Sequence, residues 1–169
     1  VYASDILHVG PDGLGWMRAM PGVGSLVVGL VLARLAAPRG MGPALFLALA
    51  GFGVSIVVFS LSELYWLSLA ALFAYGAADM ISVYVRQTLT QLATPNAMRG
   101  RVSAVNSISI NASNELGDFR AGVTAGFAGA VPAVLIGGVA TCAITILWAK
   151  LFPSLWRIDR LRDIKPTDP

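Results

Sequence analysis

The chain has 169 residues, of which 56% are hydrophobic and 12% are charged, and its formal net charge is +3. Globular proteins carry roughly 25% charged residues, so this composition favours a protein whose solvent is largely lipid. A single histidine and a single cysteine exclude a histidine-based metal cluster and an internal disulfide. Phosphate-binding and dinucleotide-binding glycine motifs are absent, and the basic residues lie between apolar runs rather than among exposed aromatics. We therefore expect no enzyme activity, no catalytic residues, no metal, no cofactor and no nucleic-acid partner.

Five apolar stretches follow one another along the chain. Each approaches the roughly 20 residues that a helix needs to cross the hydrocarbon of a bilayer. They predict an all-α fold, a polytopic membrane helical bundle with five transmembrane helices and no sheet. The predicted spans cover residues 15–36, 44–61, 64–85, 102–126 and 132–152.

Short polar segments separate the predicted spans. Between the third and fourth spans we expect a basic loop over residues 89–101, with Pro95 and Asn96 as helix breakers. Residues 153–169 are expected to form a polar tail. The chain begins at Val1 within a polar connector, so we expect it to be a fragment of a longer protein.

Charged and amide side chains interrupt three of the apolar spans. A charge near the middle of a membrane helix costs roughly 3 kcal/mol, so such residues are expected to face a bundle interior or a wet cavity. In the fourth span Asn111, Asn114 or Glu115, Asp118 and Gly122 fall on one helix face. This polar stripe predicts the wall of a substrate or proton path, and the alternative is a soluble amphipathic helix whose polar face meets water. The candidate pathway residues are Arg18, Asp79, Asn111, Asn114, Glu115, Asp118 and Arg120.

The basic residues gather in alternate connectors. If the five spans cross a membrane, one side holds ten of the 12 Lys and Arg residues, while the other holds Asp5, Asp12 and Glu63 and no basic residue. Cytoplasmic loops of membrane proteins carry such an excess, so we expect this side, with the C-terminus, to be cytoplasmic in the cell (inner or plasma) membrane. A soluble bundle has no reason to segregate its charges by alternate loops. The ten residues are Arg34, Arg39, Arg86, Arg99, Arg101, Lys150, Arg157, Arg160, Arg162 and Lys165.

Three motifs give the chain a family resemblance. Residues 29–34 and 38–40 resemble the G-x-x-x-D-R-x-G-R loop of major facilitator superfamily transporters, with Ala33 where the acid usually stands. Residues 95–102 resemble the P-x-x-x-R-G-R-V loop before helix eleven, and residues 113–117 resemble helix eleven itself. The chain thus resembles the C-terminal half of such a transporter, of the bacterial type related to enterobactin exporters.

The resemblance implies an arrangement for the whole chain. The five spans would be helices eight to twelve, and helix seven with the N-terminal six-helix half would be missing partners. The family works by alternating access, with two halves rocking around a site near the membrane midplane. Spans one, three and four would line the cavity, and spans two and five would pack on their outside and face lipid. The cytoplasmic gating loops would contain Arg34, Arg39, Arg99 and Arg101.

These features predict a fragment of a secondary active transporter, a proton-coupled exporter of small molecules of drug or siderophore type. The alternative is a non-transporting membrane scaffold or sensor that uses the same charges as structural ties. We further predict that Arg18 meets Asp118 or Glu115 across the cavity in at least one conformation, because an unpaired buried charge is costly. Otherwise Arg18 extends to the outer surface of the membrane. The partners expected are the lipid bilayer, the missing half, a small-molecule substrate and protons.

Overall fold

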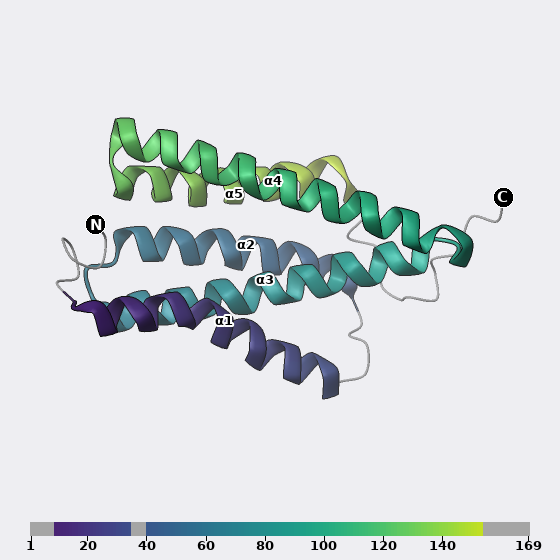
Figure 1. Ribbon diagram of the computed structural model, residues 1–169, viewed down its shortest axis with the longest axis horizontal. Helices are drawn as coiled ribbons and strands as arrows, with labels where there is room; N and C mark the ends of the chain where they lie inside the picture. Colours follow the sequence, from purple (N-terminus) through teal and green to yellow (C-terminus); the bar gives the residue numbers. More distant parts are fainter. Residues whose placement is uncertain (1–8, 35–39, 154–169) are drawn as a thin grey trace.

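The computed structural model describes residues 9–34 and 40–153. Over these ranges the regular secondary structure is entirely helical, which confirms the predicted all-α fold (Figure 1). The helices lie roughly side by side, and each of the five predicted spans overlaps one of the long helices. The elements are α1 (Pro11–Arg34), α2 (Met41–Leu61), α3 (Tyr65–Ala93), η2 (Asn96–Met98), α4 (Arg99–Ala128) and α5 (Ala130–Leu151). The expected tail from residue 154 onward lies outside the described residues.

The predicted loop over residues 89–101 is wrong, because α3 continues to Ala93 and α4 begins at Arg99. Within α3 the hydroxyl of Thr90 donates to the carbonyl of Arg86 at 2.9 Å, so this side chain supports the helix rather than a loop. The helix stops before Pro95, since a proline disfavours helical geometry in the residue that precedes it. Thr94 accordingly has an extended conformation, with φ −100° and ψ 125°.

Helices α1 and α3 touch backbone to backbone. A Cβ atom added to Gly76 of α3 would collide with the carbonyl of Pro21, and one added to Gly24 of α1 would collide with the carbonyl of Phe73. The hydroxyl of Ser25 lies 2.9 Å from the carbonyl oxygen of Pro21 and 3.0 Å from that of Gly76. Figure 1 shows α1 bending near its middle, as expected where proline removes a helix hydrogen bond. Small residues thus bring α1 onto α3.

Helix α2 packs between α3 and α5. On the α5 side, a Cβ added to Gly53 would lie 2.6 Å from the sulfur of Cys142, and one added to Gly138 would lie 2.9 Å from a methyl of Val57. The uncharged α2 carries small residues on two faces and so contacts two neighbours, while α5 packs on α2 and α4. The prediction that spans two and five cover the outside of spans one, three and four stays a prediction.

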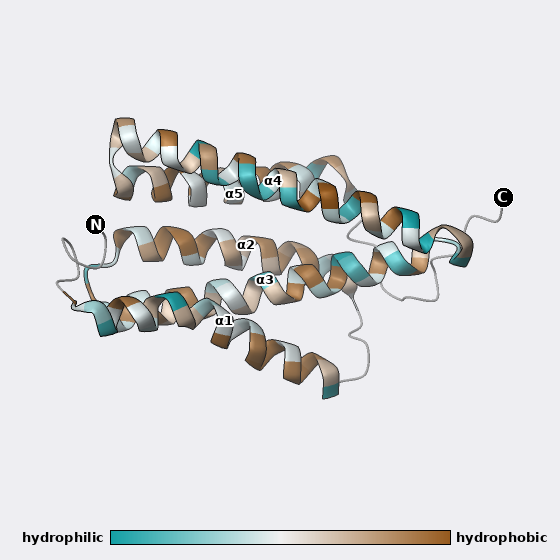
Figure 2. Cartoon of the chain, in the orientation of Figure 1, coloured by the Kyte–Doolittle hydropathy of each residue, from teal (hydrophilic) through white to brown (hydrophobic). Residues whose placement is uncertain are grey.

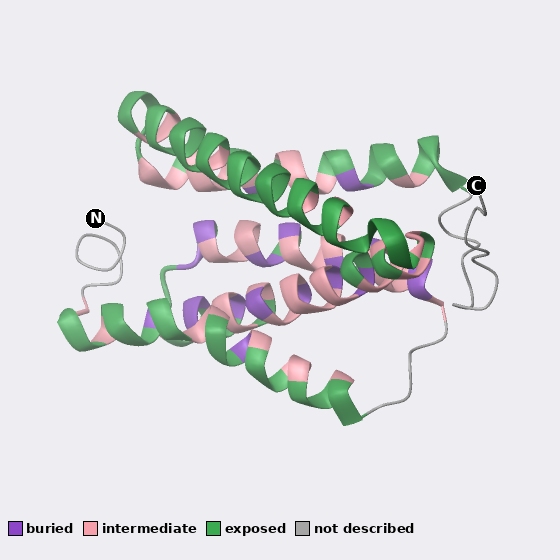
Figure 3. Ribbon diagram, turned by 45° about the vertical axis from the view of Figure 1, so that its right-hand side comes forward, coloured by how far each residue is buried: buried purple, intermediate pink, exposed green. Residues whose placement is uncertain are grey.

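Burial is uneven across the bundle. Helices α2 and α3 hold most of the buried positions, including Met41, Phe46, Leu69 and Val85, whereas α4 has none (Figure 3). Helix α4 packs mainly on α5 and makes no extensive interface with α1, α2 or α3. The chain thus consists of a packed set of helices and one long helix that is largely uncovered.

Four of the helices, α1, α2, α3 and α5, are long and apolar enough to cross a membrane. Helix α4 is longer than any of them but is not among these four. Its charged, asparagine and serine side chains lower its hydropathy, and Figure 2 shows hydrophilic positions recurring along it. Helix length and hydropathy therefore support four of the five predicted transmembrane helices, and α4 as a fifth is not confirmed.

Candidate functional site

Two rows of mostly polar side chains face each other between α3 and α4. The two helices are joined through η2 and share no extensive interface. Their side chains line an open space between them. We call this space the α3–α4 groove. Its lining repeats every three or four residues on each helix, which places each row on one helix face. The groove is lined by Asp79, Val83, Arg86, Gln87, Leu89 and Thr90 of α3 and by Asn106, Ser109, Ile110, Ser113 and Asn114 of α4.

The groove contains two adjoining hollows. The one nearer η2 has a volume of about 480 Å³ and includes Gln87, Thr90 and Asn106. The other has a volume of about 340 Å³ and includes Asp79 and Asn114. Both are lined by Val83, Arg86 and Ile110, so the side chain of Arg86 borders the whole groove. A third hollow, of about 490 Å³, follows α3 towards Arg99.

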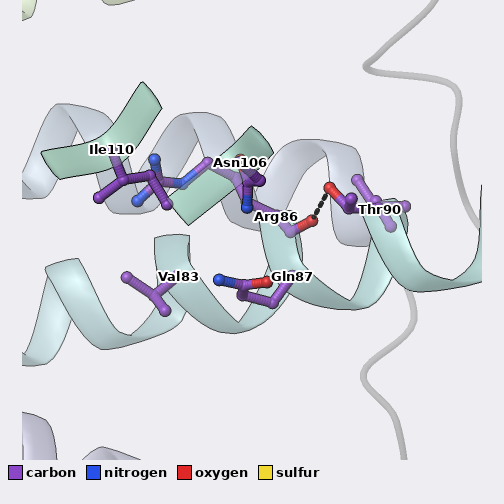
Figure 4. A pocket seen from close by; sticks show the side chains of 7 residues that line it. Val83, Arg86, Gln87, Thr90, Asn106 and Ile110 are labelled. Atoms are coloured by element: carbon purple, nitrogen blue, oxygen red, sulfur yellow. Dashed lines mark hydrogen bonds between the residues drawn. The ribbon is translucent and has the colours of Figure 1, made fainter. Parts of the chain in front are cut away.

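Arg86 reaches from α3 towards α4 (Figure 4). Its Nε atom donates to the carbonyl of Ser82 one turn earlier, at 3.4 Å, so the side chain runs back along α3. The close-up shows it beside Asn106 and Ile110 of α4, which line the same hollow. Within residues 9–34 and 40–153 no carboxylate forms an ion pair with it. Arginine is charged at all relevant pH values, so the groove carries a permanent positive charge.

Asp79 supplies an opposite charge to the same groove. Its side chain is half-buried and lines the hollow of about 340 Å³ together with Arg86. The two residues are seven positions apart, which corresponds to a rise of about 10.5 Å along the helix. Tyr75 of α3 lies within electrostatic reach of both Asp79 and Asp118. The groove therefore has a basic region and an acidic region.

The structure brings some of the predicted pathway residues together and leaves others apart. Asp79 and Asn114 line the groove, whereas Asp118 is exposed and lines none of its hollows. Asn111 and Glu115 are exposed and line none of the three hollows. Helical geometry explains this, because Glu115 is nine residues from Asn106 and so lies about 180° around α4.

The two predicted arginines of the pathway point elsewhere. A guanidinium nitrogen of Arg120 lies 3.8 Å from where a Cβ of Gly137 would be, so this side chain lies against α5. Arg18 is exposed on α1, and Figure 1 shows α1 and α4 on opposite sides of the bundle. The pairing of Arg18 with Asp118 or Glu115 is absent from this conformation and stays a prediction for another.

The predicted gating arginines lie at helix ends. Arg34 is the last residue of α1, and Arg99 opens α4 with its Nε atom donating to the carbonyl of Thr94 at 3.3 Å. Arg101 is exposed in the first turn of α4. Arg39 lies outside the described residues. Their gating role stays a prediction.

Sequence reasoning did not select Arg86, Gln87, Thr90 or Asn106 as pathway residues. Arg86 was interpreted as a signal of membrane orientation, and the third span was ended one residue before it. The available signal was its spacing of seven residues from Asp79, which puts both side chains near one helix face.

Four helices are long and apolar enough to cross a membrane, and charged and amide side chains face a groove between α3 and α4. These features define a multi-pass α-helical membrane protein. Residues 1–163 match the family model described as transmembrane secretion effector. The chain therefore belongs to this family of the major facilitator superfamily, whose members are transporters rather than enzymes. Comparison with curated proteins and with solved structures gives no significant match.

Proposed function

We propose that the chain is part of a proton-coupled exporter of small molecules that works by alternating access. The single observation that carries the proposal is the α3–α4 groove, because polar and charged residues within an otherwise apolar bundle mark substrate or ion pathways. Membership of the secretion effector family supports export as the direction of transport. The relation to enterobactin exporters, and a drug or siderophore as substrate, rest on the sequence motifs.

Helix α4 would be the fifth transmembrane helix. It starts beside the end of α3 and finishes beside the start of α5, at the opposite end of the bundle (Figure 1). If α3 and α5 both cross the bilayer, α4 must cross it as well. A lipid-facing stripe supports this, since six exposed apolar side chains lie within about 100° of one another around the helix. They are Val105, Ile108, Leu116, Phe119, Val123 and Phe127.

A second half of the transporter would complete the pathway. The predicted polar stripe of α4 includes Asn111, Glu115 and Gly122, all exposed, and a Cβ added to Gly122 would meet nothing within 4 Å. Leaving such residues against lipid would be costly. The N-terminal half, as the family arrangement implies, would cover this stripe and close the cavity. The basic connectors would then be cytoplasmic, with the protein in the inner or plasma membrane.

The proton would be carried by an acid of the pathway. Asp79 is the acid that lines the groove, and Asp118 and Glu115 lie on α4. A carboxylate in a partly dry cavity can bind and release a proton as the cavity opens to one side or the other. We assign the coupling step to Asp79 because it shares its hollow with Arg86 and Asn114.

Proton coupling can be tested with the full-length protein in proteoliposomes under an imposed pH gradient. We expect candidate exporter substrates to produce a proton flux, measured with a pH-sensitive dye, and Asp79→Asn to abolish it. Lys150→Gln is a suitable control, because Lys150 is exposed at the end of α5 and lines none of the hollows. Substrate movement without proton flux would refute the coupling. If no substrate moved at all, the protein would instead be a membrane scaffold or sensor.

A further inference from the structure

The α3–α4 groove contains the positive charge of Arg86, with which no carboxylate in the described part of the chain forms an ion pair. Arg86 has five N–H donors, and one of them, on Nε, is directed to the carbonyl of Ser82. Arg86 lines both hollows of the groove. Arg86 is exposed to the groove in this structure. Once the second half of the transporter covers the groove, Arg86 would be withdrawn from bulk water, where an arginine is normally satisfied by an anion, so a ligand is its natural partner there.

The residues around Arg86 favour one kind of ligand. Gln87 and Asn106 offer amide groups, while Val83 and Ile110 offer apolar surface in the same hollow. Asp79, two helical turns away, would repel a second negative charge. A single carboxylate therefore fits the site better than a doubly charged phosphate.

We propose that Arg86 is a substrate-binding residue that selects small organic molecules carrying one carboxylate. The carboxylate accepts hydrogen bonds from the guanidinium, and the amides of Gln87 and Asn106 lie beside it. The uncharged part of the molecule lies against Val83 and Ile110 and extends towards Asp79. This inference rests on the proposed transport function and names the class of its substrate.

The test measures binding, so it does not depend on transport. The full-length protein in nanodiscs is titrated with dansylglycine, which has a carboxylate, and with dansylglycinamide, which has a neutral amide in its place. Dansyl fluorescence rises in apolar surroundings and reports occupancy. The variants are Arg86→Gln, which removes the charge, and Arg86→Lys, which keeps it without the planar fork. Lys150→Gln removes a positive charge that lies outside the hollows.

We expect the wild-type protein to bind dansylglycine at least tenfold more tightly than dansylglycinamide. Arg86→Gln should remove this preference by weakening dansylglycine alone, about tenfold, which corresponds to about 1.4 kcal/mol. Arg86→Lys should keep part of the preference, and Lys150→Gln should keep all of it. Unchanged binding of the amide shows that each variant is folded.

Four results would overturn the inference. Equal affinity of the two probes for the wild type would mean that another part of the protein neutralises Arg86. Equal weakening of both probes by Arg86→Gln would assign Arg86 a structural role. Absence of saturable binding of either probe would show that the groove is not a site for such molecules. Flux that is insensitive to Arg86→Gln would reject this site while leaving transport intact, whereas selective binding without flux would reject transport and keep the site.

Discussion

Two adjoining sides of α3 differ in what they meet, although Gly76 and Asp79 are only about 60° apart around the helix. On one side Gly76 lies against the backbone of α1 so closely that no Cβ fits between the helices. On the other side Asp79 and Arg86 face the α3–α4 groove, where α3 and α4 share no extensive interface. A close-packed interface and a polar space thus adjoin on one helix.

The difference shows how a membrane bundle accommodates polar groups. Helices in lipid associate through close van der Waals packing, which small residues such as Gly24 and Gly76 permit. Charged side chains cannot enter such an interface without losing hydration, so they remain where the helices diverge. The close-packed side of α3 provides the stability that allows the other side to stay open.

The largest effect on stability is expected at the close-packed side. Gly76→Ala would force α1 and α3 apart, because its Cβ would collide with the carbonyl of Pro21. Overpacking of this kind costs about 1–3 kcal/mol. Unfolding by denaturant in detergent micelles, followed by circular dichroism, measures the loss.

Gly117→Ala on α4 is the matched control, since its Cβ would meet nothing within 4 Å. It should be neutral or stabilise the helix by up to about 1 kcal/mol, because alanine is the better helix former. Equal destabilisation by both substitutions would contradict the distinction between the two sides.

A smaller effect is expected from two serines of the packed region. Ser25→Ala removes a hydroxyl that lies within hydrogen-bonding distance of the Gly76 carbonyl across the interface, and it should cost about 0.6 kcal/mol, the average for such bonds in membrane proteins. Ser82 is buried, and its hydroxyl has no hydrogen-bond partner in the described part of the chain. Ser82→Ala should therefore be neutral or slightly stabilising. The same unfolding assay applies, and a greater loss for Ser82→Ala than for Ser25→Ala would show that the hydroxyl of Ser82 has a partner.

Much of the fold was predictable from the sequence. Apolar stretches of nearly membrane length predict helices because each backbone group must be hydrogen-bonded within its own segment in lipid. The close contact of Gly76 with α1 was not predictable, because local spacing does not tell which helix will pack against which.

The site was predictable only in part. Asp79 and Asn114 were selected because polar groups are costly within an apolar span, and the groove contains both. Glu115 met the same criterion but lies on another face of α4, since the composition of a helix does not fix its rotation. Arg86 was missed because an arginine near the end of a span serves equally well as a signal of orientation.

The account depends most directly on water reaching the α3–α4 groove and not the α1–α3 interface. Single cysteines can be placed in the full-length protein after its own cysteines, Cys142 included, are replaced. A thiol reacts through its thiolate, which forms only where water is present. Asn114→Cys probes the groove, Ser25→Cys the packed interface, and Leu116→Cys the predicted lipid-facing stripe about 200° around α4 from Asn114.

The reagent is the positively charged, water-soluble 2-(trimethylammonium)ethyl methanethiosulfonate, added to protein in lipid vesicles. The account predicts rapid modification of Asn114→Cys and little or none of Ser25→Cys and Leu116→Cys. If Asn114→Cys reacted as slowly as Leu116→Cys, the groove would be closed to water and the proposed pathway would be wrong.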